Sequence, residues 1–230
     1  TSALRANTTG DRNVAMGATS LDANTTGAAN TALGYDALGA NTTANSNTAI
    51  GAYSLDANTT GGDNVAVGSS ALTANTTASN NTAVGVSALL AVTTGAENTA
   101  VGANALKTIT TGTRNTAVGF EALELNTSSD NVAVGYLALD TCTTGSNNTA
   151  VGTECMDANT SGEANVAMGY RALDANTTGD SNVAVGQQAL GANTTADNNT
   201  AVGKEALLAN TTGSSNVALG RLALTANTTA

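Results

Sequence analysis

One pattern of apolar and polar positions, 17 residues long, recurs along nearly the whole chain. Residues 64–80 read Asn-Val-Ala-Val-Gly-Ser-Ser-Ala-Leu-Thr-Ala-Asn-Thr-Thr-Ala-Ser-Asn, and similar segments precede and follow them. We number each unit from its opening asparagine as position 0. Position 2 is always Ala, position 3 is Val, Ile, Leu or Met, position 4 is always Gly, and position 12 is always Thr. Position 8 is Leu except for Met156. Such self-similarity at a fixed period is typical of repeat architectures.

We interpret residues 1–230 as a single repeat array, cut from a longer one, with a partial coil over 1–12 and thirteen coils after it. All spacings are 17 residues except the step from 115 to 131, which is 16. The missing residue falls near Ser128–Asp130, which predicts a surface turn that tolerates a deletion. The coils open at Asn13, Asn30, Asn47, Asn64, Asn81, Asn98, Asn115, Asn131, Asn148, Asn165, Asn182, Asn199 and Asn216.

The length and composition of the unit predict an all-β fold, a parallel β-solenoid of about thirteen 17-residue coils. A helical hairpin repeat needs roughly 33 residues or more. β-Branched residues at positions 1 and 3 favour a strand at positions 1–3, stacked on the next coil at about 4.8 Å. The opening asparagines predict a ladder of amides hydrogen-bonded from coil to coil. The invariant glycine predicts a positive φ or a close backbone approach.

The two faces of the predicted strand differ. Positions 1 and 3 share one face, and the invariant Ala at position 2 (Ala15, Ala32, Ala49 and their equivalents) points the other way. We expect positions 1 and 3 to face the coil's own core and the Ala column to contact another chain. Each coil offers only about two large apolar side chains, and small cores are commonly supplemented by oligomerisation. The sequence therefore predicts a homo-oligomer.

Charge is sparse and restricted to a few positions. The chain has 7 basic and 17 acidic residues and a net charge of −10, and all of these residues fall at positions 5, 6, 9, 15 and 16. These positions are expected to face solvent, since unpaired charges are costly to bury. The acidic balance argues against nucleic acid as a partner. Membrane insertion is not expected, because no apolar run approaches about 18 residues.

Candidate catalytic chemistry is lacking. The chain has no His, and its acids lie at variable positions without a nucleophile-and-base motif. We expect no enzymatic activity, cofactor or metal, and the Gly-Gly-x-Gly-x-Asp pattern of calcium β-rolls does not occur. Cys142 and Cys155 lie at positions 11 and 7 of consecutive coils. We expect them to be unpaired and buried, with a disulfide as the alternative.

The segments Asn64-Val-Ala-Val-Gly and Asn47-Thr-Ala-Ile-Gly resemble the Asn-Ser-Val-Ala-Ile-Gly repeat of YadA-like trimeric autotransporter heads. The longer pattern Asn-Thr-Ala-Val-Gly-x-x-Ala-Leu-x-x-Asn-Thr-Thr-Gly is similar to repeats of phage tail-fibre proteins. The resemblance implies a left-handed homotrimeric fibre, extracellular, on a cell surface or on a virion. The implied function is that of a structural shaft or adhesin head. A receptor or glycan would then contact variable surface positions, and the candidates are Tyr35, Tyr53, Tyr136 and Tyr170.

Two other functions fit the repeat. Adjacent Thr columns at positions 12 and 13 allow a monomeric ice- or glycan-binding solenoid, which predicts the Ala column inside a single core. Uncapped coils also allow an extracellular filament assembled end to end. Asn-x-Thr/Ser sequons make N-glycosylation a further possibility. These sequons begin at Asn7, Asn24, Asn41, Asn58, Asn75, Asn80, Asn126, Asn147, Asn159, Asn176, Asn193, Asn198, Asn210 and Asn227.

Overall fold

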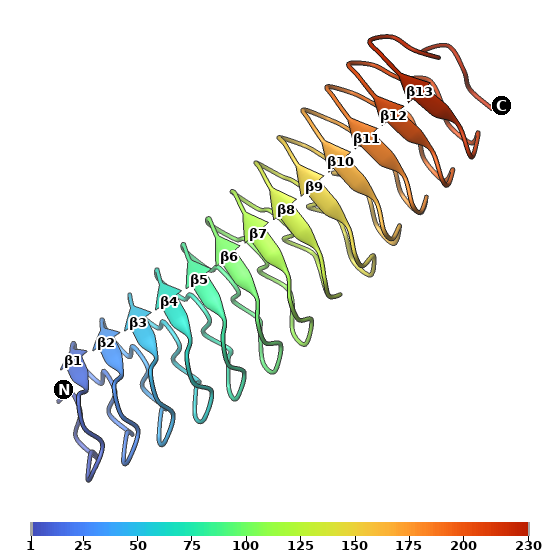
Figure 1. Ribbon diagram of the computed structural model, residues 1–230. Helices are drawn as coiled ribbons and strands as arrows, with labels where there is room; N and C mark the ends of the chain where they lie inside the picture. Colours follow the sequence, from blue (N-terminus) through green and yellow to red (C-terminus); the bar gives the residue numbers. More distant parts are fainter. Residues whose placement is uncertain (1, 230) are drawn as a thin grey trace. The chain divides into compact units, whose positions relative to one another are not determined.

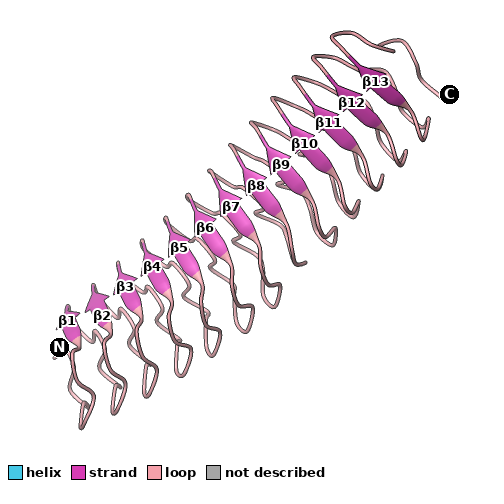
Figure 2. Ribbon diagram, in the orientation of Figure 1, coloured by secondary structure: helices cyan, strands magenta, loops and turns pink. Residues whose placement is uncertain are grey.

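The computed structural model describes residues 2–229, in which the only regular elements are thirteen strands of three residues, one per repeat (Figures 1 and 2). Each strand occupies positions 1–3, as the sequence predicts. The strands are β1 (Val14–Met16), β2 (Thr31–Leu33), β3 (Thr48–Ile50), β4 (Val65–Val67), β5 (Thr82–Val84), β6 (Thr99–Val101), β7 (Thr116–Val118), β8 (Val132–Val134), β9 (Thr149–Val151), β10 (Val166–Met168), β11 (Val183–Val185), β12 (Thr200–Val202) and β13 (Val217–Leu219).

The chain forms two compact units, Thr1–Arg114 with β1 to β6 and Asn115–Ala230 with β7 to β13. Within each unit, consecutive strands pair in parallel and in register, so that equivalent residues of neighbouring repeats are partners. Ala66 pairs with Ala83 in the first unit, and Ala150 pairs with Ala167 in the second. The predicted parallel β-solenoid with 17 residues per turn is thereby confirmed.

The invariant glycines stack on one another at the end of each strand. Gly68 has a φ of +140°, in the region that only glycine adopts readily. A Cβ atom placed on Gly68 would lie 2.4 Å from the carbonyl oxygen of Gly85 in the next coil. The coils therefore approach so closely at this corner that no side chain fits, which confirms the prediction made from the repeat.

The expected assignment of the two strand faces is wrong. Ala32, Ala49 and Ala66 at position 2 are fully buried within their own chain, so the Ala column cannot be a contact between chains. Positions 1 and 3 face outward instead, and Ile50 remains 37% exposed. The interior of each coil already holds the Leu column of position 8 and two asparagine columns, all fully buried except at the terminal coils. Beside these residues the inner face of the strand has room for a methyl group only.

Each complete 17-residue coil also bends through three non-glycine residues with positive φ, at positions 6, 8 and 16. In one coil these are Ser70 (+59°), Leu72 (+53°) and Asn80 (+61°). The left-handed conformation costs an L-residue roughly 1–2 kcal/mol. Hydrogen bonds to neighbouring coils offset this cost: the Leu72 N–H, for example, donates to the Ala88 carbonyl at 3.0 Å. Coil stacking therefore maintains a backbone path that an isolated repeat would not favour.

This strain predicts that Ala164→Gly stabilises the protein. Ala164 is exposed, has a φ of +55°, and donates its N–H to the Ser146 carbonyl, a bond that glycine retains. We expect a gain of about 0.5–1 kcal/mol in the free energy of unfolding, measured by urea denaturation. The matched control, Ala167→Gly, lies three residues further on at a buried, extended position and should lose about 1 kcal/mol. A loss of stability in Ala164→Gly would contradict the strain argument.

Candidate functional site

The predicted ladder at position 0 is present. Most of its rungs run from side chain to backbone, and in some coils amide groups also bond to each other, as from Asn98 Nδ2 to Asn81 Oδ1 at 3.2 Å. The Asn47 Oδ1 atom accepts a hydrogen bond from the backbone N–H of Asn64 at 3.0 Å, and its Nδ2 atom donates to the Gly61 carbonyl at 2.9 Å. The same pair of contacts recurs along both units, for example at Asn148. Each of these asparagines thus ties its own coil to the next one.

A second asparagine ladder lies at position 11, and here the rungs join side chain to side chain. In the first unit the Asn41 Nδ2 atom donates to Asn24 Oδ1 at 2.8 Å, and the Asn75 Nδ2 atom donates to Asn58 Oδ1 at 2.9 Å. Both ladders converge on the carbonyl of position 14. The Ala44 carbonyl, for instance, accepts Nδ2 hydrogens from Asn30 and Asn41 at 2.8 and 3.2 Å.

This second ladder corrects the interpretation of most sequons as glycan sites. The position-11 asparagines of the interior coils are fully buried, so the folded chain has no space for a sugar on them. Asn7 and Asn227 in the terminal coils are partly exposed, whereas the position-16 residues Asn80, Asn147 and Asn198 are exposed. The buried sequon residues are Asn24, Asn41, Asn58, Asn75, Asn126, Asn159, Asn176, Asn193 and Asn210.

The position-11 ladder is interrupted by apolar residues, and the interruptions leave visible defects. Val92 follows Asn75 in the column, and the buried Asn75 Oδ1 atom has no hydrogen-bond partner. Cys142 interrupts the ladder of the second unit: its Sγ atom donates to the Gly145 carbonyl at 3.4 Å. Cys142 and Cys155 are both buried free thiols, in line with the preferred interpretation and not with a disulfide.

The short coil preserves the ladder despite its missing residue. The Asn115 Nδ2 atom donates to the Ser128 carbonyl at 2.9 Å, so position 13 supplies the acceptor that position 14 supplies elsewhere. The Asn131 N–H still donates to Asn115 Oδ1 at 3.0 Å. The turn at Ser128–Asp130 is partly buried, and the deletion is absorbed there without a change in strand register.

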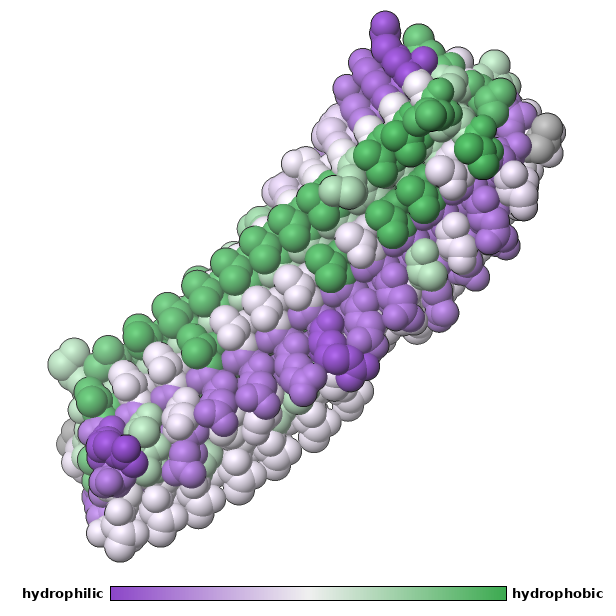
Figure 3. Space-filling model, viewed as in Figure 1, coloured by the Kyte–Doolittle hydropathy of each residue, from purple (hydrophilic) through white to green (hydrophobic). Residues whose placement is uncertain are grey.

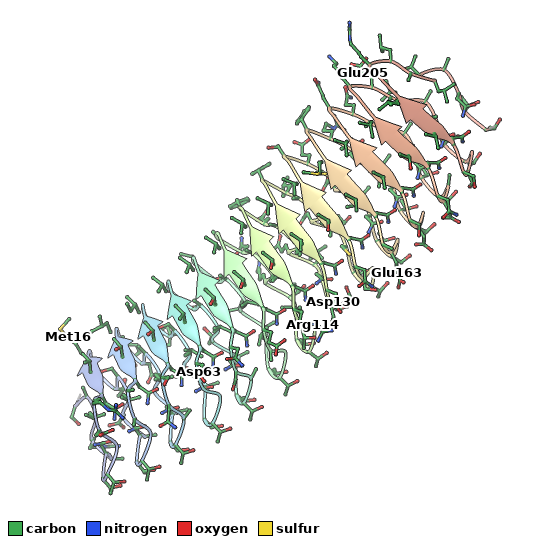
Figure 4. All side chains as sticks on the ribbon, viewed as in Figure 1. Met16, Asp63, Arg114, Asp130, Glu163 and Glu205 are labelled. Carbon is green, nitrogen blue, oxygen red and sulfur yellow. The ribbon has the colours of Figure 1, made fainter. Side chains whose placement is uncertain are left out.

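An uncharged strand face runs along each unit. We use this name for the outward side chains of positions 1 and 3 on β1–β6 in the first unit and on β7–β13 in the second. Position 1 is Val or Thr, and position 3 is always aliphatic or Met. Within each unit, Figure 3 shows position 3 as a green row beside a mixed green and white row. The Met16 side chain points away from its coil in Figure 4. The same figure labels charged residues at other positions of the repeat, such as Asp63 and Glu163.

Hydroxyl groups of the Thr column at position 12 are used within the fold. The Thr25 Oγ1 atom donates to the Thr42 carbonyl of the next coil at 3.0 Å, and Thr177 does the same to Thr194. Position 13 is exposed in most coils, as at Thr26 and Thr60. The adjacent Thr columns therefore differ in role, one binding backbone and the other facing solvent.

Four acidic residues follow one another at position 9 of consecutive coils in the second unit: Glu124, Asp140, Asp157 and Asp174. Burial, and after it the neighbouring charges of Glu124, Asp157 and Glu121, raise the pKa of Asp140 to about 6. The Asp140 Oδ1 atom is buried without a hydrogen-bond partner. Burial also raises the pKa of Asp157. Asp174 has a cationic partner, with Arg171 Nε at 2.7 Å from its Oδ2 atom.

The structure brings the candidate tyrosines together in part. Tyr35 and Tyr53 make an edge-to-face contact with ring centroids 5.3 Å apart. Tyr136 stacks instead on Phe120, at 5.8 Å and 12° between the ring planes. Tyr170 is 47% exposed, close to the exposed fractions of the other aromatic residues. The chain thus presents two aromatic pairs and a single tyrosine on its surface.

Over residues 2–229 the structure has no pocket and no group of three or more metal-ligating side chains. None of the described segments is a helix of the length and apolarity needed to cross a membrane. No protein-family model, curated protein or solved structure matches this chain. The features of this chain that can carry a function are the asparagine ladders, the strand face and the surface aromatic residues.

The buried ladder predicts that Asn58→Val destabilises the protein. The substitution removes the donor of Asn41 Oδ1 and the acceptor of Asn75 Nδ2. Buried polar atoms left without partners cost about 1–3 kcal/mol, and urea denaturation should show a loss of this size. The control Thr60→Val, two residues away at an exposed position, should stay within about 0.5 kcal/mol of wild type. Equal stability of the two variants would disprove a stabilising role for the ladder.

The raised pKa of Asp140 predicts that the free energy of unfolding decreases as the pH rises. The folded carboxyl binds its proton more tightly than the unfolded one, whose pKa is near 3.8, so stability is lost as the pH rises from about 4 through about 6. Asp140→Asn should therefore raise the free energy of unfolding at pH 7 by about 1 kcal/mol, a value discounted for partial exposure, and change it little at pH 4. Thermal melts at both pH values test this.

Asp63→Asn removes the same charge from an exposed site and serves as the control. It should leave the melting temperature at pH 7 nearly unchanged. A similar gain in both variants would attribute the effect to net charge and not to the buried carboxyl of Asp140.

Proposed function

We propose that this chain is a structural fibre protein, a rigid shaft or adhesin-head segment of an extracellular appendage on a cell surface or a virion. The observation that carries the proposal is that consecutive coils within each unit are joined by in-register strands and buried asparagine ladders. Three chains in a left-handed homotrimer is the assembly that the resemblance to trimeric autotransporter heads implies.

The ladders support a mechanical role. A solenoid lengthens by about 4.8 Å for each added coil, so repeat number sets length. Bending such a coil stack requires stretching hydrogen bonds, and here the strands, the Thr hydroxyls and the two asparagine columns contribute them, the second column wherever Asn occupies position 11. Uniform bonding between neighbours suits a spacer that carries load better than it suits a site that binds and releases a small ligand.

Surface attachment would use the aromatic residues. Tyr35, Tyr53, Tyr136 and Tyr170 are each 43–50% exposed and are supported by coils whose backbone is fixed. Exposed tyrosine rings offer apolar area with a polar end, a combination common at recognition surfaces. In this proposal they contact a receptor or glycan.

A specific observation favours a second candidate, a monomeric ice- or glycan-binding solenoid. That function requires the Ala column to lie inside a single-chain core, and Ala32 and Ala49 do lie there. The strand face would then remain open to its ligand. An end-to-end filament is a third possibility that shares the structural role of the fibre.

Immunogold electron microscopy of the source material tests the fibre proposal, with antibody raised against residues 1–230. The expected result is label along extended appendages on cells or virions. Two results together would overturn it in favour of the monomeric solenoid. The label would be confined to dispersed material, and the purified chain would have a solution mass near 22.3 kDa and inhibit ice growth.

A further inference from the structure

We infer that the strand face binds a second copy of this chain, in place of the Ala column that the sequence suggested as the interface. The inference rests on the proposed fibre function and names its assembly surface. The contact would consist of the outward side chains of positions 1 and 3, and position 3 would supply its uniformly apolar row (Figure 3).

Exposure and chemistry support this assignment. Ile50, Val84 and Val118 are 36–37% exposed, and Met168 is 45% exposed. Positions 1 and 3 carry no charged residue on any of the thirteen strands, although the chain has 24 charged residues at other positions. Contiguous exposed apolar rows of this kind mark interaction surfaces in soluble proteins. The side chains cannot turn inward to escape water, because the Ala column and the Leu column occupy the interior.

The area suits a complete partner. A three-residue strand is about 10 Å long and stacked strands are about 4.8 Å apart, so each strand offers about 50 Å². Thirteen strands offer about 600 Å² per copy, or about 1,200 Å² for two copies, the lower end of the range for specific interfaces. The six or seven strands of one unit supply only about half of this area, so a stable association needs the faces of both units of each copy.

The regular spacing of the outward side chains along the strand face favours a copy of the same chain as the partner. Side chains of position 3 recur once per coil, and sheets that pack face to face at about 10 Å interdigitate such side chains. A partner surface without the same repeat can interdigitate with only a few of these side chains, whereas another copy of the chain can interdigitate with the whole row. The absence of charge on the face removes electrostatic attraction to a charged partner. The net charge of −10 also disfavours an anionic membrane.

The test is the mass of the complete chain by native mass spectrometry and by light scattering after size exclusion. Wild type is expected at two or three times the 22.3 kDa chain mass. The variant Val84→Lys with Met168→Lys places one charge on the face in each unit. It should dissociate to the chain mass, with association weakened by at least about 100-fold and an unchanged circular dichroism spectrum.

The control Thr77→Lys with Thr178→Lys adds the same charge at exposed loop positions, one in each unit, and should remain associated. If the lysine variant fails to fold, Val84→Thr with Met168→Thr replaces it. Threonine already occupies outward strand positions in this fold, and these substitutions should weaken association about tenfold or more.

A wild-type chain that is folded and monomeric would overturn the inference. An oligomer that stays intact in the strand-face variant, Val84→Lys with Met168→Lys, as it does in the control would also overturn it, since the interface would then lie elsewhere. Neither result decides the fibre proposal, which depends on the location of the protein in electron micrographs. Adsorption of a folded wild-type monomer to ice would identify ice as the occupant of the strand face and would also overturn the inference.

Discussion

The constraint on which the fold depends is that each coil must close after 17 residues and return one strand spacing from its start. At that spacing the coils touch backbone to backbone, so the column at position 4 has to be glycine, as the predicted clash between a Gly68 Cβ and the Gly85 carbonyl illustrates. The 16-residue coil obeys the same constraint by a different route. It gives up a turn residue and uses the Ser128 carbonyl as the ladder acceptor, which leaves strand pairing intact.

A narrow coil has little apolar volume, and the interior is therefore partly polar. Leu and Ala columns supply the apolar part, while two asparagine columns supply hydrogen bonds that each neighbouring coil satisfies. A buried polar ladder is most stabilising when it is continuous, because an interruption can leave an atom without a partner. Val92 leaves Asn75 Oδ1 in this state. Asn126, by contrast, finds acceptors within its own unit at Asn115 and Ser128.

Features that depend on local geometry could be predicted from the sequence. The period, the strand at positions 1–3, the positive φ of Gly68 and the ladder at position 0 all belong to this group. The direction of the strand faces could not be predicted, since alternation separates two faces without saying which one lies inside. The sequence left glycan attachment open for the Asn58 column, because sequon and ladder share the same residues. The signal for an inward position was the set of apolar residues Val92, Ile109 and Cys142 in the same column, which a solvated position would not favour.

The composition of position 3 bears on whether the strand face is covered. At position 1 the choice of Val or Thr has a sufficient explanation in strand propensity, because both residues are β-branched. At position 3 that explanation fails. Leu33, Met168 and Leu219 are not β-branched, and threonine, an equally good strand former, never occurs there. What the residues of position 3 share is apolarity, at a site the single chain leaves partly in water. Apolarity maintained at an outward position supports the proposal that a second copy covers the strand face.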